Sequence, residues 1–571
     1  MTSQPPLAGR ASAGAGAVAA RLLKRTGIAS ALLVALFAGL LQVRAPQPAG
    51  PDAPADAFSA ARAMEKVGVI AAEPRPAGSP AHDRVRDFLL AELTGLGLQP
   101  EVQTAEADSI WEPGRRVPIE NIIARFPGTA GGSGKAVLLM AHYDSVPGTP
   151  GAGDNAAAIA AMLETARALR AGEPLKNDVL LLMTDGEEMG LHGAKAFAYE
   201  HPLARSVGLA LNFDARGNRG PSFMFETSED NGGLIREFVR GAPQPVAYSL
   251  LHYAYNLLSN ETDLTPLMDS GLPGMNFVFA MGLNAYHKES DTPDNLDAAS
   301  LQHHGSYMLG LARHFGGLDL ENIRREDRVY FNVFGGTMVS YTHTWAVGLT
   351  LPCALLLLAT LWHGFKRRRL TVGGLGGGLL LALLGIGLTY GIGALAWSIV
   401  RAEASPPQYA EIVEDPIVSA FYFVGVLALA LAIAFVPVRL VSRLIRADDL
   451  WGGALLLWML LCAGTALWLP GGSYLLLWPL LFSLIGLNVS FAVQRNAAGL
   501  LSALSAMPGI ALFAPVAYLT FVMLTSEMTA ELVAFSTLPC TLIYPLLKGV
   551  GRNGNGKGAS RGKEGMEEQL T

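Results

Sequence analysis

Cysteine is scarce in this sequence. Three of the 571 residues are cysteines, and all lie in apolar stretches of the C-terminal half: Cys353, Cys462 and Cys540. This distribution excludes a disulfide framework and a zinc site built from thiolates. Since no cysteine precedes Cys353, disulfides give no indication of the compartment in which the N-terminal half resides.

Charged residues are also scarce. They make up 16% of the chain, the formal net charge is −6, and no basic patch is interleaved with aromatic residues, which argues against a nucleic-acid-binding protein. In contrast, 51% of the residues are hydrophobic, and the mean hydropathy is +0.32. A composition this apolar predicts membrane-spanning segments, and the length predicts more than one domain.

The N-terminus has the pattern of a membrane anchor followed by a linker. Residues 1–25 are rich in small and basic residues, and an apolar run covers residues 28–43. We interpret residues 1–44 as a cytoplasmic basic segment with an uncleaved signal anchor, with cleavage near Ala45 as the alternative. In either case the basic flank stays in the cytoplasm and the following residues are translocated. Residues 45–57 are rich in Pro and Ala and are predicted to form a linker.

From Trp345 onward, long apolar runs alternate with short polar loops. Residues 345–547 are therefore predicted to form a transmembrane domain, because most runs reach the roughly 20 residues that a bilayer requires. The expected spans are 345–362, 372–400, 417–436, 450–468, 474–493, 500–524 and 532–547. Basic clusters lie at alternate ends of these runs, which predicts about eight crossings in all, both termini cytoplasmic and residues 548–571 as a cytoplasmic basic tail. No expected span carries a central charged pair, so no ion pathway is predicted.

Residues 58–317 are predicted to form a globular α/β domain. Short apolar runs typical of strands alternate with helical patterns, as expected for a largely parallel central sheet flanked by helices. The expected strands cover residues 119–126, 136–140, 179–183, 209–213 and 275–279. The expected helices cover residues 84–98, where apolar residues recur at helical spacing, and the alanine-rich stretch 155–170. Residues 318–344 are expected to connect this domain to the spans.

Polar side chains with metal-binding chemistry follow the expected strands. The five residues are His142, Asp154, Glu188, Asp214 and His287. Because the carboxyl ends of parallel strands lie at one edge of a sheet, we expect these side chains to converge. Two histidines and three carboxylates suit zinc or a similar divalent cation, and one carboxylate can bridge a pair of ions.

Two adjacent carboxylates, Glu187 and Glu188, come shortly after the run at residues 179–183. Such a pair can divide the work of a metal site, because one carboxylate can bind the metal while the other handles a proton. For an isolated Glu-Glu pair, the alternative is a solvated acidic turn. The polar residues after the other strands favour the catalytic interpretation.

Four motifs give the domain a resemblance to a known family. They read HYDS at 142–145, GDN at 153–155, TDGEEMGLHG at 184–193 and YHKESDTPDNLD at 286–297. Residues 75–297 resemble the co-catalytic di-zinc aminopeptidase family, which includes bacterial leucyl aminopeptidase and the glutamate carboxypeptidases. The motifs NFDARG and NETDLTP, together with the multi-span C-terminus, resemble the membrane-anchored branch of vacuolar and endoplasmic-reticulum zinc peptidases.

The resemblance implies a zinc-exopeptidase-like fold with two Zn²⁺ ions. The implied ligands are His142 and Asp214 for one ion, Glu188 and His287 for the other, and Asp154 as the bridge. A cis peptide bond between Asp154 and Asn155 is implied as well. The implied general base is Glu187, which would take a proton from the metal-activated water.

The same resemblance implies roles for residues around the ligands. Asp144 would orient His142, and Asp291 would do the same for His287. Tyr286 either polarises the oxyanion or packs structurally. Arg216 pairs either with a substrate carboxylate or with a structural one. The remaining histidines match no ligand position and are expected on the surface or in the core: His82, His192, His201, His252, His303 and His304.

These patterns lead to a functional hypothesis. We expect a membrane-anchored metallo-exopeptidase that acts as an aminopeptidase on peptides, with its catalytic domain outside the cytoplasm. That side would be periplasmic or extracellular in a bacterium and lumenal in a eukaryote. Two alternatives stay open, namely a carboxypeptidase or other amide hydrolase of the same fold, and a membrane peptide receptor or transporter with a non-catalytic domain. The expected partners are a peptide substrate and the lipid bilayer, with no nucleic acid, and the sequence leaves the oligomeric state undecided.

Overall fold

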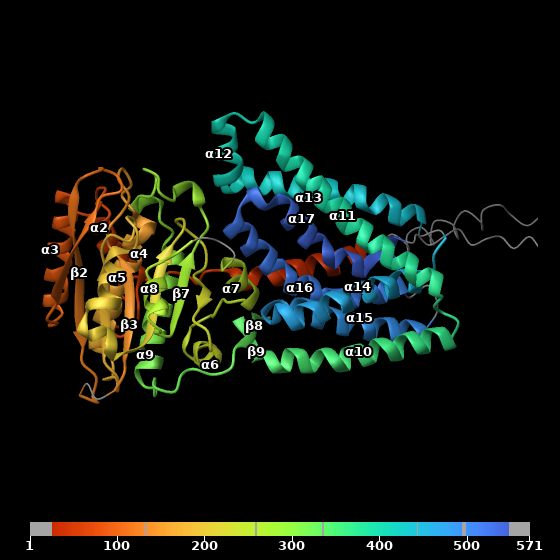
Figure 1. Cartoon of the computed structure of the whole chain (residues 1–571), viewed down its shortest axis with the longest axis horizontal. Coiled ribbons are helices and arrows are strands. Elements are labelled where there is room, and N and C mark those ends of the chain that lie inside the picture. The colour runs from red at the N-terminus through yellow and green to blue at the C-terminus, as the bar shows by residue number, and fades with distance from the viewer. Residues whose placement is uncertain are drawn as a thin grey trace, which may run out of the picture.

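The computed structural model describes residues 26–131, 134–256, 260–333, 336–441, 444–493 and 498–547. The chain forms an α/β domain and a helical region that lie end to end (Figure 1). The predicted basic segments at residues 1–25 and 548–571 fall outside the described residues.

The α/β domain is built on a seven-stranded sheet with the order β1-β2-β4-β3-β5-β7-β6. Its strands are β1 (Glu101–Asp108), β2 (Arg116–Phe126), β3 (Ala136–His142), β4 (Val179–Thr184), β5 (Val207–Ala215), β6 (Phe223–Thr227) and β7 (Gly274–Phe279). The four strands β4, β3, β5 and β7 pair in parallel, whereas β2 joins β4 and β6 joins β7 in antiparallel fashion. The predicted largely parallel central sheet is therefore confirmed.

Helices cover both faces of the sheet. One face packs against α2 (Ala60–Ile70), α3 (Pro80–Gly95), α4 (Ala157–Ala171), α6 (Gly232–Gly241) and α9 (Ala298–Gly316), and the other against α5 (His192–Glu200) and α8 (Leu264–Asp269). Successive residues of β3 alternate between the two cores, with Leu139 in the first and Leu138 in the second. A strand buried on both faces must be apolar throughout, which explains why these strands read as continuous apolar runs.

Helix α4 is buried along almost its whole length. Its many alanines present little side-chain volume, so the helix packs closely between the sheet and its neighbours α2 and α9. The chain enters α4 through a π-type turn, η2 (Ala152–Ala156), which replaces the beginning of the helix predicted from residue 155. This turn carries Asp154 to the edge of the sheet where the parallel strands end.

The sequence analysis missed four strands. β1 is largely polar and lies at the edge of the sheet, where one side of the strand faces solvent, and β6 is only five residues long. β8 (Arg328–Asn332) and β9 (Met338–Thr342) form a hairpin within the predicted connector. The predicted linker at residues 45–57 is bound along the domain, because Arg167 donates hydrogen bonds to the carbonyls of Ala55 and Ala57.

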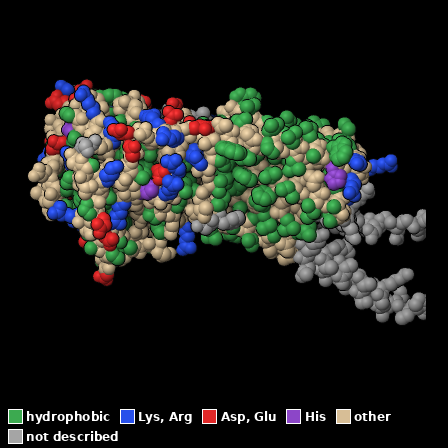
Figure 2. All heavy atoms as spheres, turned by 90° about the horizontal axis from the view of Figure 1, so that it is seen from below, with side chains coloured by type: hydrophobic (Ala, Val, Ile, Leu, Met, Phe, Trp, Pro, Cys, Tyr) green, Lys and Arg blue, Asp and Glu red, His purple; other side chains and the backbone are tan. Residues whose placement is uncertain are grey.

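Among the described residues, eight helical segments are long and apolar enough to cross a membrane. They are Thr26–Val43, α10 (His343–Lys366), α11 (Val372–Glu403), α13 (Pro416–Val441), α14 (Ala447–Trp468), α15 (Tyr474–Ala492), α16 (Ala498–Leu524) and the broken segment Ser526–Leu546. The last segment contains α17 (Thr529–Thr537) and most of α18 (Tyr544–Leu547). Hydrophobic side chains cover the visible surface of this region, whereas charged side chains gather over the α/β domain (Figure 2). The chain is thus an integral membrane protein, and we call residues 343–547 the membrane domain.

The membrane domain has a buried polar contact that the sequence analysis did not single out. Nε of Arg369 lies 2.7 Å from Oδ2 of Asp448, and both side chains are buried. Asp449 accepts a hydrogen bond from the backbone N–H of Thr371 at 2.7 Å. These residues lie at the ends of α11 and α14, where an ion pair costs less than at the centre of a bilayer.

Candidate active site

The five predicted ligands converge at the carboxyl ends of the parallel strands. His142 ends β3, Asp214 lies near the end of β5, and Glu188 follows β4. His287 follows β7 after a short 3₁₀ turn, and Asp154 comes from the η2 turn. This arrangement agrees with the general position of ligand sites in parallel sheets.

Asp154 lies between the two histidines. Its Oδ1 is 3.1 Å from Nε2 of His142, and its Oδ2 is 3.0 Å from Nε2 of His287. Asp214 Oδ1 is 3.6 Å from His142 Nε2, and Glu188 Oε1 is 3.2 Å from His287 Nε2. The structure therefore brings the five residues together as two groups that share one carboxylate.

The chemistry of these donors fits divalent cations. Within each group of three residues the candidate ligand atoms lie within 4.8 Å of one another, and ligands about 2.1 Å from a tetrahedral zinc ion would be separated by roughly 3.4 Å. Glu188 Oε1 and His287 Nε2 are buried, and although they lie 3.2 Å apart, neither has a partner with hydrogen-bond geometry. Buried polar atoms are normally paired, so these two atoms are best explained as ligands of a group that binds between them.

The electrostatics of the site also favour a cation. Burial alone would lower the pKa of His287, but the adjacent carboxylates of Asp154 and Glu188 outweigh it and raise the pKa to about 10. Burial and the neighbouring Asp154 raise the pKa of Glu188 to about 7. Histidines that hold protons and carboxylates that resist ionisation both indicate an excess of negative charge, which a divalent cation would neutralise.

Asp144 links the two halves of the site. Its Oδ1 lies 3.4 Å from Nδ1 of His142, and its backbone carbonyl oxygen lies 3.3 Å from the same nitrogen. Its two carboxylate oxygens also accept hydrogen bonds from the backbone N–H groups of Glu187 and Glu188, at 3.3 Å each. A single buried carboxylate therefore positions a side chain on β3 and the acidic turn after β4.

Glu187 lies outside the two groups that share Asp154, but with His142 and Glu188 it forms a third group whose candidate ligand atoms lie within 4.8 Å of one another. It lines a cavity of about 410 Å³ together with Asp154, Asp214 and Tyr286. Burial raises the pKa of Glu187 well above its ordinary value, and the neighbouring carboxylates Asp214 and Glu188 add to that increase. A carboxylate in such a position is a stronger base than one in water.

Two other predicted site residues, Tyr286 and Arg216, have distinct surroundings. Tyr286 stacks on the ring of His287, with ring centroids 3.8 Å apart, and faces the cavity. Arg216 also lines the cavity, and its Nη1 donates a hydrogen bond to the carbonyl of Met523 in the membrane domain at 2.7 Å, so the structure shows a backbone partner for this side chain. Burial raises the pKa of Tyr286.

Asp291 has partners that the sequence analysis did not foresee. Its two oxygens accept hydrogen bonds from the backbone N–H groups of Gly153 and Asp154, at 2.8 and 3.1 Å. Asp291 therefore holds the turn that carries Asp154, and its role toward His287 stays a prediction. The peptide bond between Asp154 and Asn155 is cis, as predicted.

Arg75 begins the region of family resemblance, but the sequence analysis gave its side chain no role. Its side chain is completely buried. Nε donates to the carbonyl of Tyr143 at 2.6 Å and Nη2 to that of Gly151 at 3.0 Å, which ties the end of β3 to the loop before Asp154. Burial lowers the pKa of Arg75 to about 10, although nearby carboxylates oppose this change. An arginine in a Pro-rich motif gives no sequence signal that it will be buried.

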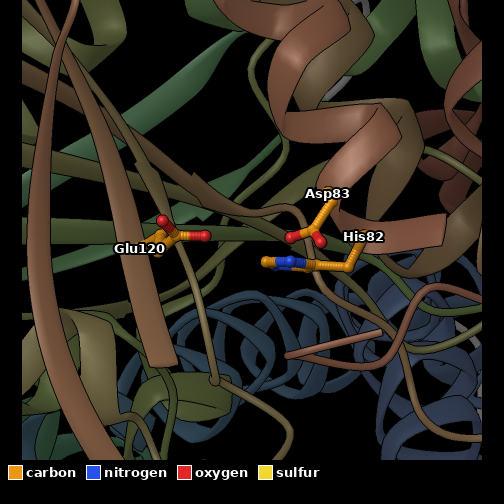
Figure 3. A group of neighbouring side chains, drawn as sticks. All are labelled: His82, Asp83 and Glu120. Carbon is orange, nitrogen blue, oxygen red and sulfur yellow. The ribbon is translucent and has the colours of Figure 1, made fainter. Parts of the chain in front are cut away.

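His82 belongs to a separate buried pair. Nε2 lies 2.8 Å from Oδ1 of Asp185, and the ring stacks on Tyr143 with centroids 4.6 Å apart. Figure 3 shows His82 and Asp83 facing Glu120 across the gap between α3 and β2. Five further histidines that the sequence analysis named are buried or partly buried and lie outside the two groups around Asp154: His192, His201, His252, His303 and His304.

Comparison with known proteins gives similarities over the α/β domain. Residues 121–312 match the model described as Peptidase family M28. Endoplasmic reticulum metallopeptidase 1 from Mus musculus is 29% identical over 246 residues, covering 42% of this chain and 27% of that protein. The Homo sapiens protein of the same name is 26% identical over 362 residues, covering 59% and 40%. Vacuolar membrane protease from Candida dubliniensis is 28% identical over 280 residues, covering 48% and 30%. The chain thus spans between about a quarter and two fifths of the length of these relatives.

Solved structures with a similar chain path include a cyclase and a peptidase. Glutaminyl cyclase from Porphyromonas gingivalis has a TM-score of 0.37 and 22% identity, over 45% of this chain and 97% of that one. An aminopeptidase from Aneurinibacillus sp. strain AM-1 has a TM-score of 0.37 and 15% identity, over 45% and 93%. Similarity at this level does not select between their activities.

Proposed function

Because residues 121–312 form a Peptidase M28 domain, we propose that this membrane protein is a metallo-exopeptidase with two divalent cations, most simply Zn²⁺. The observation that carries the proposal is the position of Asp154, whose two oxygens face two different histidines. His142, Asp154 and Asp214 would hold one cation, and Asp154, Glu188 and His287 the other.

When bound, the cations would supply Lewis acidity, which polarises a carbonyl oxygen and makes water a stronger acid. Glu187 would accept the proton from that water and pass it to the leaving amine, since its carboxylate faces the cavity and belongs to neither group around Asp154. Tyr286 would donate a hydrogen bond to the developing oxyanion, because its half-buried side chain lines the same cavity.

Two features support an aminopeptidase. The exposed carboxylate of Glu261 lies in the wall of the cavity and offers a partner for a substrate ammonium group. Arg216 is the corresponding candidate for a substrate carboxylate, but one of its nitrogens already donates to the carbonyl of Met523. Because Arg216 still lines the cavity, a carboxypeptidase remains the second candidate function.

We further propose the domain arrangement and orientation predicted from the sequence. Residues 58–317 would be the catalytic domain and residues 345–547 the transmembrane domain, with the catalytic domain outside the cytoplasm. Basic residues around 366–369 and 439–446 would then lie on the cytoplasmic side. A reporter inserted after Arg369 should be cytoplasmic and one at Pro407 should be on the side of the catalytic domain, and the reverse pattern would contradict this orientation.

The activity is tested on the full-length protein purified in detergent. We expect about two zinc ions per chain by elemental analysis and hydrolysis of peptides with a free N-terminus. Acetylation of the N-terminus should abolish hydrolysis, whereas amidation of the C-terminus should not. The opposite result with the blocked peptides would establish the carboxypeptidase. Peptide binding by the metal-loaded protein without any hydrolysis would instead favour a receptor or transporter.

A further inference from the structure

The candidate active site opens toward the membrane domain. The cavity of about 410 Å³ that reaches Asp154 and Glu187 includes Met523, a residue of α16. A second cavity of about 490 Å³ shares part of this lining, namely Arg216, Asn260, Tyr286 and Met523. Its other walls come largely from the membrane domain, and include Val413, Glu414, Leu524, Glu527 and Met528. The two cavities therefore meet at the seam between the two parts of the protein.

Direct contacts hold the two sides of this seam together. Nη1 of Arg216 donates a hydrogen bond to the carbonyl of Met523 at 2.7 Å. Five residues earlier on the same helix, the hydroxyl of Tyr518 donates to Sδ of Met281 at 3.2 Å. Figure 1 shows α12 (Pro406–Glu414) and α17 at the end of the membrane domain that faces the α/β domain. These two hydrogen bonds, from Arg216 to Met523 and from Tyr518 to Met281, fix the position of Met523 relative to the candidate active site.

The chain after Met523 forms a turn that several hydrogen bonds hold in place. Thr525 has a φ of 59°, an unfavourable value for a β-branched residue, and its side chain accepts a hydrogen bond from the N–H of Glu527. Glu527 Oε1 accepts a hydrogen bond from the hydroxyl of Tyr409 on α12 at 2.6 Å, and the hydroxyls of Ser526 and Ser419 lie 2.6 Å apart. A turn held in this conformation by several partners is typical of functional sites.

The lining of the first cavity indicates which part of a substrate it would accept. One part of its wall is apolar, with Phe225, Val278 and Ala280 from β6, β7 and the residue after β7, and Met523 from the membrane domain. Met523 is 7% exposed, and a methionine side chain adapts to apolar groups of different shape. The second cavity combines the charged side chains of Arg216, Lys288, Glu414 and Glu527 with apolar ones, and the charged groups offer partners for the amide groups of an extended peptide.

We propose that the membrane domain forms one wall of the substrate site and selects the residue that is removed. On this inference, which rests on the proposed peptidase function, an apolar N-terminal side chain lies against Met523, and the rest of an extended peptide leaves through the seam along residues 523–528. The substrate class is thus peptides with an apolar N-terminal residue, and the α/β domain alone lacks part of the specificity site.

The test uses the full-length protein with the substitutions Met523→Ala, Met523→Trp and Met523→Leu. The substrates are the 4-nitroanilides of alanine, leucine and phenylalanine. Met523→Trp should lower kcat/KM for leucine and phenylalanine by about 10-fold or more relative to alanine, chiefly through KM, because pocket contacts of one or two methylenes have effects of this size. Met523→Ala should shift preference toward phenylalanine, and Met523→Leu should retain the wild-type order.

Leu504→Ala is the matched control, because Leu504 lies on the same helix with 48% of its surface exposed, away from both cavities. This variant should keep the wild-type preference, and all variants should keep the wild-type metal content, which shows that they fold. If neither Met523→Ala nor Met523→Trp alters the preference of an active enzyme, the proposed wall is wrong.

A binding experiment separates this inference from the proposed function. In a Glu187→Gln background, the dissociation constant of a Leu-Ala-Ala peptide is measured by calorimetry with and without Met523→Trp. Weaker peptide binding in the double variant supports the proposal that Met523 forms a wall of the substrate site. This holds even if the wild-type enzyme hydrolyses none of the substrates, and in that case only the peptidase proposal fails. Equal binding in both variants, or no binding to either, overturns the proposal that Met523 forms a wall of the substrate site.

Discussion

Nε2 of His82 lies 2.8 Å from Oδ1 of Asp185, and both side chains are almost completely buried. The other oxygen of Asp185 accepts a hydrogen bond from the backbone N–H of Glu120 at 2.8 Å. Asp185 comes two residues before Glu187, so the pair of His82 and Asp185 supports the turn that carries Glu187 and Glu188. Removing one member of a buried pair leaves the other without its partner in a site of low polarity.

His82→Ala should therefore destabilise the α/β domain by about 3 kcal/mol or more, because it leaves Asp185 unpaired. The matched control is Arg84→Ala on the same helix, which removes an exposed ion pair with Glu73 and should change stability by less than about 1 kcal/mol. Thermal unfolding of the full-length protein in detergent measures both. Equal unfolding temperatures for the two variants would show that the buried pair contributes little.

The adjacent carboxylates Glu187 and Glu188 should respond differently to the same substitution. Glu187→Gln should keep its metal and lower kcat by roughly 10²–10⁴-fold, because the amide cannot accept a proton. Glu188→Gln should lose metal, because a neutral amide replaces an anionic ligand, and added zinc should restore part of the activity. Elemental analysis and kcat distinguish the two. Metal loss in Glu187→Gln with retention in Glu188→Gln would reverse the assignment.

Asp144 should affect metal affinity without touching the metal. Asp144→Asn removes the charge beside Nδ1 of His142 and weakens the acceptors for the N–H groups of Glu187 and Glu188. We expect about 10–100-fold weaker zinc binding, as for other partners of ligand histidines. Titration with a competing chelator measures this loss. Unchanged zinc affinity would limit Asp144 to a structural role in the turn.

Glu226 should make the protein less stable as the pH rises. Its side chain is 6% exposed and accepts a hydrogen bond from Asn276, and burial raises its pKa from 4.5 to about 7. Between these values the folded state keeps a proton that the unfolded state releases, so stability falls as pH rises through this window and stays low above it.

Glu226→Gln removes this titration. The variant should unfold at a higher temperature than the wild type at pH 8, by an amount equivalent to at most about 3 kcal/mol, and should show no such gain at pH 4.5. Thermal unfolding at the two pH values is the measurement. An equal rise in unfolding temperature at both pH values would mean that glutamate and glutamine at position 226 differ in packing and not in ionisation.

The sequence predicted the central part of the fold because burial on both faces leaves a clear pattern. Runs such as Val179–Met183 are apolar at every position, and each is followed by a polar residue at the shared edge of the sheet. For the same reason the five candidate ligands could be selected before any geometry was available. The polar strand β1 gave no such signal, since an edge strand buries few of its side chains.

Contacts between distant segments could not be predicted in this way. The burial of Arg75 depends on backbone carbonyls of Tyr143 and Gly151, which any sequence would supply at those positions. Asp291 occurs near His287 in sequence, yet in the structure it binds the turn around Asp154. Likewise, nothing in the apolar pattern of α16 indicates that Met523 faces the candidate site and not lipid.

The order of these segments along the chain has a consequence for biosynthesis. The α/β domain is complete once β9 has been synthesised, because residues after α9 such as Tyr330 and Met338 belong to its core. At that stage no helix from α10 onward exists, and domains generally fold as units during synthesis. The five candidate ligands could therefore assemble on the nascent chain and take up metal. Met523 is made only near the end, with α16. A newly made chain would thus pass through a stage in which its metal centre is formed but its substrate cavity is still open on one side. Insertion of the last helices would then set the moment at which selective hydrolysis begins.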